Sequence, residues 1–146
     1  MLCAIRYNNF MPKETFSTSL AAIPAGLLAG DAAAALVITL IGFATHQSSL
    51  TDFRWLTTFV PLCLAWLMIA PWLGVYRAEV YRSPRQLWRP ALAMFLAGPW
   101  AALLRALMLN AAVLPIFALV LAASGAAGML VWRFVYLGLT RGGRHG

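Results

Sequence analysis

Four side chains carry chemistry that this mostly apolar chain has to accommodate. Asp31, Arg105 and Arg133 each lie inside a run of apolar residues, and His46 directly follows one. A charge within such a run needs an opposite charge, a wet cavity or a short reach to water, because its desolvation is costly. We predict that Asp31 pairs with Arg133; Arg105 is the alternative partner.

These charges admit a structural and a functional interpretation. In the structural one, which we favour, the pair holds two helices in register while Arg105 reaches outward toward Asp52 and the polar residues 47–49. In the functional one, two arginines against one aspartate leave a net positive site that attracts a small anion, or Asp31 and His46 belong to a proton path. The functional interpretation predicts a small homo-oligomeric transporter or channel.

His46 has a further interpretation as an axial metal ligand. A neutral imidazole beside an apolar bundle suits a haem or a chlorin, which would make the protein a pigment- or haem-binding subunit. The apolar runs contain no second histidine, and the sequence has no Cys-x-x-Cys-His motif. We therefore expect no cofactor and no metal site, and we expect His46 to form hydrogen bonds at the membrane interface.

The sequence lacks the usual enzyme motifs. It contains no paired carboxylates, no His/Cys cluster, no G-x-S-x-G and no P-loop. Its two cysteines, Cys3 and Cys63, are too few for a disulfide scaffold, and Cys63 lies within an apolar run. We expect a protein that is not an enzyme.

The elements that position these residues are membrane helices. Of 146 residues, 62% are hydrophobic and 10% are charged, which excludes a compact soluble domain. We predict an all-α, integral membrane four-helix up-down bundle over residues 20–136, with a cytoplasmic segment at 1–19 and a basic cytoplasmic tail at 137–146. Runs of roughly 20 apolar residues can cross the hydrocarbon core, and the predicted helices are about 20–45, 55–76, 91–109 and 111–136.

Basic residues indicate the orientation of the bundle. Two lie in the N-terminal segment, four between residues 77 and 89 and two in the tail, and with four spans all eight fall on one face. The opposite face has Arg54 alone. We therefore predict that both termini are cytoplasmic and that the protein resides in the inner membrane. The net charge of +7 then reflects the basic residues on the cytoplasmic face, and we expect no nucleic-acid partner.

Small residues indicate where helices pack. Gly26 and Gly30 have GxxxG spacing, and Gly125 and Gly128 belong to a zone of small residues in the fourth helix. These faces pack either on each other, which we favour, or on a partner chain. Gly98-Pro99 predicts a kink in the third helix.

The small size and the predicted packing faces favour one function class over the others. We expect a non-enzymatic accessory or assembly subunit that packs in the bilayer against a larger membrane complex. A homo-oligomer is the alternative.

A pattern of small, polar and aromatic residues runs through all four predicted helices. It consists of Gly30-Asp31, Gly42 with His46, Pro61 with Trp66, Arg105, and Trp132-Arg133. Its order and spacing resemble domain-of-unknown-function family 3054, over roughly Leu28 to Arg133. The resemblance implies a small bacterial or archaeal membrane protein with four helices, and it implies no activity. Where the family usually has a basic residue and a serine before the histidine, this chain has Phe43-Ala44-Thr45.

Overall fold

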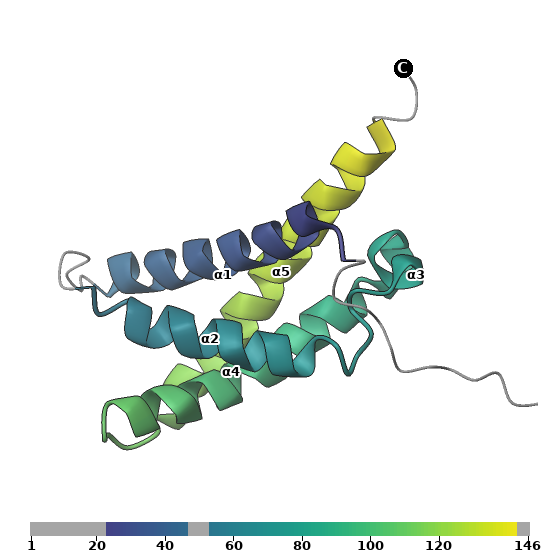
Figure 1. Ribbon diagram of the computed structural model, residues 1–146. Helices are drawn as coiled ribbons and strands as arrows, with labels where there is room; N and C mark the ends of the chain where they lie inside the picture. Colours follow the sequence, from purple (N-terminus) through teal and green to yellow (C-terminus); the bar gives the residue numbers. More distant parts are fainter. Residues whose placement is uncertain (1–22, 47–52, 143–146) are drawn as a thin grey trace, which may run out of the picture.

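The protein is helical throughout the part of the chain that the computed structural model describes, residues 23–46 and 53–142, and no strand occurs there (Figure 1). Three of its helices, α1, α4 and α5, are long and apolar enough to cross a membrane. The elements are α1 (Ala25–Thr45), α2 (Leu56–Ile69), α3 (Ala78–Tyr81), the 3-10 turn η2 (Pro84–Gln86), α4 (Trp88–Met108) and α5 (Pro115–Gly142).

Prolines determine where α1 and α5 begin. Pro24 is extended, with φ −58° and ψ 119°, and α1 starts at the next residue instead of near residue 20. Pro115 is the first residue of α5, four residues later than expected. Proline fits the first turn of a helix, where its missing N–H would have no partner, but it disfavours helical geometry in the residue before it. The expected start at residue 111 is therefore wrong.

The second helix is shorter than the expected span of 55–76. α2 ends at Ile69, just before Pro71, which has no N–H to continue the helical hydrogen bonds. The chain then turns through Gly74, whose φ is +63°, and the Val75 N–H donates to the Ala70 carbonyl at 3.0 Å. The 14 residues of α2 rise about 21 Å, against roughly 30 Å for a hydrocarbon core. The helix alone is too short to span it.

α4 continues as one helix through Gly98-Pro99, and it begins at Trp88 instead of residue 91. Its C-terminal end is closed by Asn110, which has a φ of +48°. The Asn110 N–H donates to Leu107 at 3.3 Å and the Ala111 N–H donates to Ala106 at 2.9 Å, the bonding pattern of a Schellman motif. Residues 109–114 therefore form a loop before α5.

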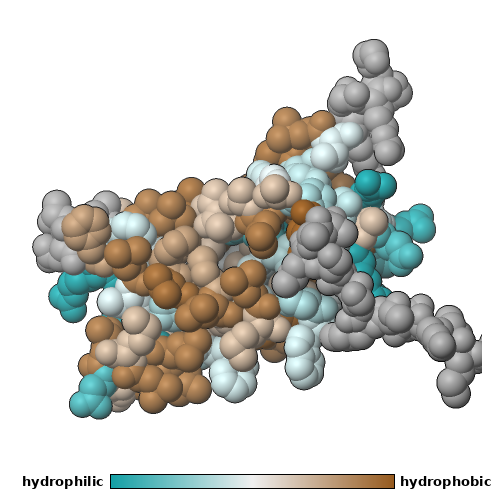
Figure 2. Space-filling model, in the orientation of Figure 1, coloured by the Kyte–Doolittle hydropathy of each residue, from teal (hydrophilic) through white to brown (hydrophobic). Residues whose placement is uncertain are grey.

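The helices pack around α4, which contacts α2 and α5 extensively, whereas α1 makes fewer contacts, with α5 and α2. In Figure 1, α1 and α2 lie side by side and α5 crosses behind them from the loop at 109–114 to the C-terminus. Large apolar side chains cover most of the visible middle surface, and hydrophilic side chains gather mainly at the two ends (Figure 2). This distribution is typical of a helix bundle surrounded by lipid.

The closest helix approach is between α4 and α5. A Cβ added to Gly98 would overlap the backbone of Ala122, and a Cβ on Gly125 would press on the side chain of Met94. Only glycine permits the first contact, because a backbone cannot rotate away as a side chain can. Gly98, which we expected to mark a kink, is therefore a packing residue.

The small-residue face of α1 is used only in part. A Cβ on Gly30 would overlap the Trp132 indole of α5, and Gly128 of α5 receives the side chain of Ile38. Gly26 has open space around it. Packing between the first and last helices, which we favoured, therefore occurs at Gly30 and Gly128 but does not include Gly26.

Candidate functional site

Asp31 and Arg133 form a buried ion pair that joins α1 to α5. The Arg133 Nη2 lies 2.8 Å from the Asp31 Oδ2, and the two residues are 2% and 1% exposed. The pairing that we predicted is therefore present, and the alternative with Arg105 is not. A pair at this distance neutralises both charges within the apolar bundle.

The second oxygen of Asp31 is also occupied. The Trp132 Nε1 donates to Oδ1 at 2.9 Å, so residues of α5 bond both carboxylate oxygens. Gly30 provides the room for the Trp132 indole. Each oxygen of this buried carboxylate therefore accepts a hydrogen bond from α5.

The guanidinium of Arg133 lies beside the aromatic ring of Tyr76. Its Cζ lies 6.0 Å from the centre of the Tyr76 ring, and the Tyr76 hydroxyl accepts a 2.8 Å hydrogen bond from the Trp66 Nε1 of α2. The Arg133 Nε and Nη1 have no hydrogen-bond partner within residues 23–46 and 53–142. The cluster links α1, α5 and the segment after α2, and its geometry is that of a structural lock.

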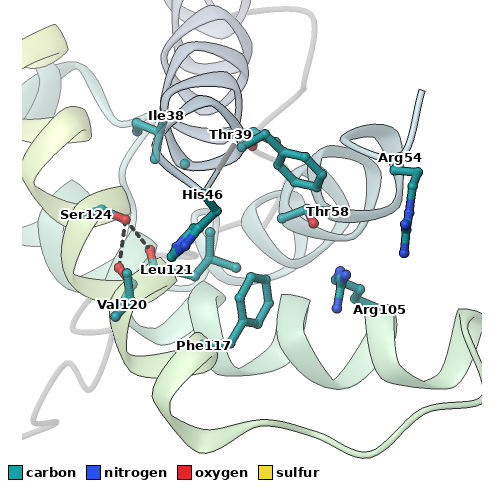
Figure 3. Close-up of a pocket in the computed structure, with 12 residues that line it drawn as sticks. Ile38, Thr39, His46, Arg54, Thr58, Arg105, Phe117, Val120, Leu121 and Ser124 are labelled. Atoms are coloured by element: carbon teal, nitrogen blue, oxygen red, sulfur yellow. Dashed lines mark hydrogen bonds between the residues drawn. The ribbon is translucent and has the colours of Figure 1, made fainter. Parts of the chain in front are cut away.

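Arg105 lies away from this ion pair, in a pocket of about 320 Å³ (Figure 3). The pocket lies where the C-terminal half of α1, the beginning of α2, the last turns of α4 and the first turns of α5 meet. Four segments that are distant in sequence therefore supply its walls. The lining residues are Ile38, Thr39, Gly42, Phe43, His46, Arg54, Thr58, Arg105, Phe117, Val120, Leu121 and Ser124.

The pocket is basic. In Figure 3, Arg54 from just before α2 and Arg105 from α4 lie on the same side of the pocket, while His46 enters from the end of α1. None of the described residues that line the pocket is a carboxylate. The predicted contacts of Arg105 with Asp52 and residues 47–49 fall on residues outside the described part of the chain.

Two polar atoms in the pocket have no partner among the described residues. The hydroxyls of Thr39 and Ser124 donate to carbonyls of their own helices, at 2.9 Å to Ala35 and 2.7 Å to Val120. The Thr58 Oγ1 and the Arg105 Nε are buried without a hydrogen bond, and Thr58 is 3% exposed.

Buried polar groups are normally satisfied, so these two donors have capacity for a partner other than the described residues. The Arg105 Cζ also lies 5.0 Å from the centre of the Phe117 ring, which supports the guanidinium in place. The pocket can therefore offer an anion one aligned cation and one hydroxyl donor.

The structure thus divides the predicted site in two. Asp31 and Arg133 come together, whereas Arg105 and His46 share the pocket. Sequence reasoning missed Arg54 and Thr58 as pocket residues, although Arg54 was notable as the one basic residue on its face. The contact of Trp66 with Tyr76 carried no sequence signal, because the turn at Gly74 brings them together.

The chain was compared with known proteins at three levels. A protein-family model described as "Protein of unknown function (DUF3054)" matches residues 28–136. Neither the search of curated proteins nor the search of solved structures found a match. The resemblance expected from the residue pattern is confirmed, and function has to be inferred from the site.

Proposed function

The chain belongs to the DUF3054 family, which has no assigned function, and from that premise we propose a function for its pocket. In this proposal the protein is a non-enzymatic multi-pass membrane protein that binds a small anion between Arg54 and Arg105. Binding is the recognition step of a transporter or channel. Asp31 and Arg133 do not belong to the proposed ligand site, because they pair with each other and neither lines the pocket.

The observation that supports anion binding is the convergence of Arg54 and Arg105 on a pocket whose described lining contains no carboxylate. Two cations repel one another most where neighbouring apolar groups exclude water, and an anion between them removes that cost. The unpartnered hydroxyl of Thr58 adds a donor to the same space.

The proposed topology has four passes through the inner membrane with both termini cytoplasmic. Three helices are long enough to span, and the fourth pass would combine α2 with the turns that follow it, whose Ala70, Val75 and Tyr76 are buried. The arginines around α3 and η2 favour the cytoplasm, which places the pocket at the outer face.

The direct test measures anion binding and flux. Purified protein in proteoliposomes is loaded with chloride, phosphate or acetate, and wild type is compared with Arg105→Gln. Since a hydrogen bond to a charged group contributes about 1.5–3 kcal/mol, the substitution should weaken binding of the favoured anion roughly tenfold or more. The matched control is Arg82→Gln, which removes an exposed arginine from the other end of the molecule.

Asp52 is the internal competitor in this experiment. If its carboxylate shields the two arginines, Asp52→Asn should strengthen anion binding, and Arg105→Gln should remove the gain. Wild-type protein that neither binds nor transports any of the three anions, with Asp52→Asn equally inactive, would refute the proposal.

A second candidate function, the accessory or assembly subunit, draws on the open space around Gly26 of α1. None of the described residues packs on that part of the small-residue face, which suits close approach by a helix of another protein. Native mass spectrometry after mild extraction tests it, and a stoichiometric hetero-complex is the expected result. An absorption spectrum of the same sample tests ligation of haem or chlorin by His46.

A further inference from the structure

The pocket is larger and more apolar than an inorganic anion requires. Its volume of about 320 Å³ lies at the lower end of small-molecule sites, which occupy about 300–1,000 Å³. A water molecule takes about 30 Å³ of liquid, so a single halide would leave most of this space to solvent. In Figure 3, Ile38, Leu121 and Phe117 lie on one side and the two arginines on the other.

We propose that the ligand is an amphipathic anion, with a carboxylate or phosphate head and an apolar body. This inference rests on the proposed function and names the ligand class of the same site. The head binds between Arg54 and Arg105, within reach of the Thr58 hydroxyl, and the body lies against the apolar wall formed by α1 and α5. Phe117 joins the two halves, because one face of its ring already carries the Arg105 guanidinium.

The amphipathic ligand is inferred from the separation of charged and apolar surface within one pocket. The two polar atoms of the pocket without a partner among the described residues, the Thr58 Oγ1 and the Arg105 Nε, belong to α2 and α4. The hydroxyls on the α1 and α5 side, those of Thr39 and Ser124, are already bonded to their own helices. Apart from the imidazole of His46 at the end of α1, that side therefore presents mainly carbon to a ligand, whereas the α2 and α4 side presents donors.

Gly42 gives an independent way to probe the apolar half. It lines the pocket from α1, and a Cβ added there would meet nothing within 4 Å. Gly42→Leu should fill the apolar space and leave both arginines in place. Gly138→Leu is the matched control, since Gly138 of α5 is equally open and does not line the pocket.

The experiment measures dissociation constants for acetate, butanoate, hexanoate and octanoate by thermal stabilisation of the purified protein in a neutral detergent. Longer carboxylates also partition into the detergent micelles, so Arg105→Gln is measured in the same micelles to correct for this effect. Affinity should rise about fourfold for each methylene that is buried, until the pocket is full. Gly42→Leu should retain acetate binding and lose the dependence on chain length, and Gly138→Leu should behave as wild type.

The outcomes separate this inference from the function on which it rests. Acetate binding that depends on Arg105 but does not strengthen with chain length would overturn the amphipathic ligand and leave anion binding intact. Chain-length dependence that survives in Gly42→Leu would overturn it too. If no anion binds in an Arg105-dependent way, the proposed function itself fails. Should Gly42→Leu not fold, Gly42→Ala fills less of the same space and should reduce the dependence in part.

Free carboxylates and membrane lipids both combine an anionic head with an apolar body. A competition experiment distinguishes these two sources. Dihexanoyl phosphatidylglycerol, with an anionic head, and dihexanoyl phosphatidylcholine, with a zwitterionic one, are each added to the octanoate complex. Displacement by the first alone assigns the site to an anionic lipid, and displacement by neither assigns it to a free organic anion. Equal displacement by both lipids would contradict recognition of the anionic head.

Discussion

At the scale of single residues, the ion pair of Asp31 with Arg133 should contribute strongly to the stability of the bundle. Both side chains are almost entirely buried, and the carboxylate is bonded at both oxygens. Removing one partner leaves an uncompensated charge in the bundle, which costs about 3–5 kcal/mol. Asp31→Asn should therefore lower the free energy of unfolding by that amount in SDS-mixed micelles.

The double variant Asp31→Asn with Arg133→Gln completes this test. Because it leaves no unpaired charge, its cost should be smaller than the sum of the two single costs. Glu79→Gln, which changes an exposed carboxylate of α3, is the control and should be neutral. Strict additivity of the two single variants would show that the pair is not coupled.

Gly30 and Gly26 provide a second prediction at this scale, four residues apart on the same helix. Gly30→Ala should displace the Trp132 indole from Asp31 and destabilise the protein by about 1–3 kcal/mol, the typical cost of overpacking. Gly26→Ala meets open space and should be neutral or stabilising by up to about 1 kcal/mol, since alanine favours the helix. Thermal midpoints and tryptophan emission measure both, and equal effects would contradict the packing described.

At the scale of elements, the contact of α4 with α5 depends on Gly98. Gly98→Ala forces a methyl group against the Ala122 backbone, and the two helices have to separate. We expect a loss of at least about 2 kcal/mol in unfolding free energy.

Its neighbour Pro99 is exposed and supplies the control. Pro99→Ala restores an N–H donor to the helix and should not destabilise it. If Pro99→Ala lowered the free energy of unfolding more than Gly98→Ala, the proline would matter more to α4 than the close contact at Gly98.

At the scale of the whole molecule, the proposed orientation requires the two ends of α4 to face opposite sides of the membrane. In a background without Cys3 and Cys63, single cysteines are introduced as Arg82→Cys, between α3 and η2, and Val113→Cys, in the loop before α5. An impermeant maleimide should label the second from the periplasm and the first only after the membrane is opened. Labelling of both from one side would contradict a crossing by α4, and with it the proposed orientation.

The two ends of the molecule have different roles in the arrangement we propose. The lock of Asp31 and Arg133 holds α1 against α5, while toward its C-terminal end α1 forms one wall of the pocket. The two sites share α1 and α5, so loosening the lock should widen the pocket. Asp31→Asn is therefore expected to weaken ligand binding without touching the ligand.

The sequence by itself determined the helical class, the membrane character and the family, because hydropathy and residue order are properties of the chain alone. It also singled out every buried charge, since a charge in an apolar run is anomalous wherever the run packs. The helix ends near Pro24, Pro71 and Pro115 could have been predicted from the sequence, because proline restricts the backbone of the residues next to it. The position of each charge along its predicted helix, however, allowed Asp31 to pair with either Arg105 or Arg133.

Only the tertiary structure decided between those partners, because the choice depends on rotation about the helix axis and on which helices touch. The packing of α5 on α1 at Gly30 and Gly128 turns Arg133 toward Asp31. The pocket arises in the same way, from segments of four helices that meet at one end. Arg54 and Thr58 became site residues only through that meeting, since no sequence pattern connects either of them with Arg105.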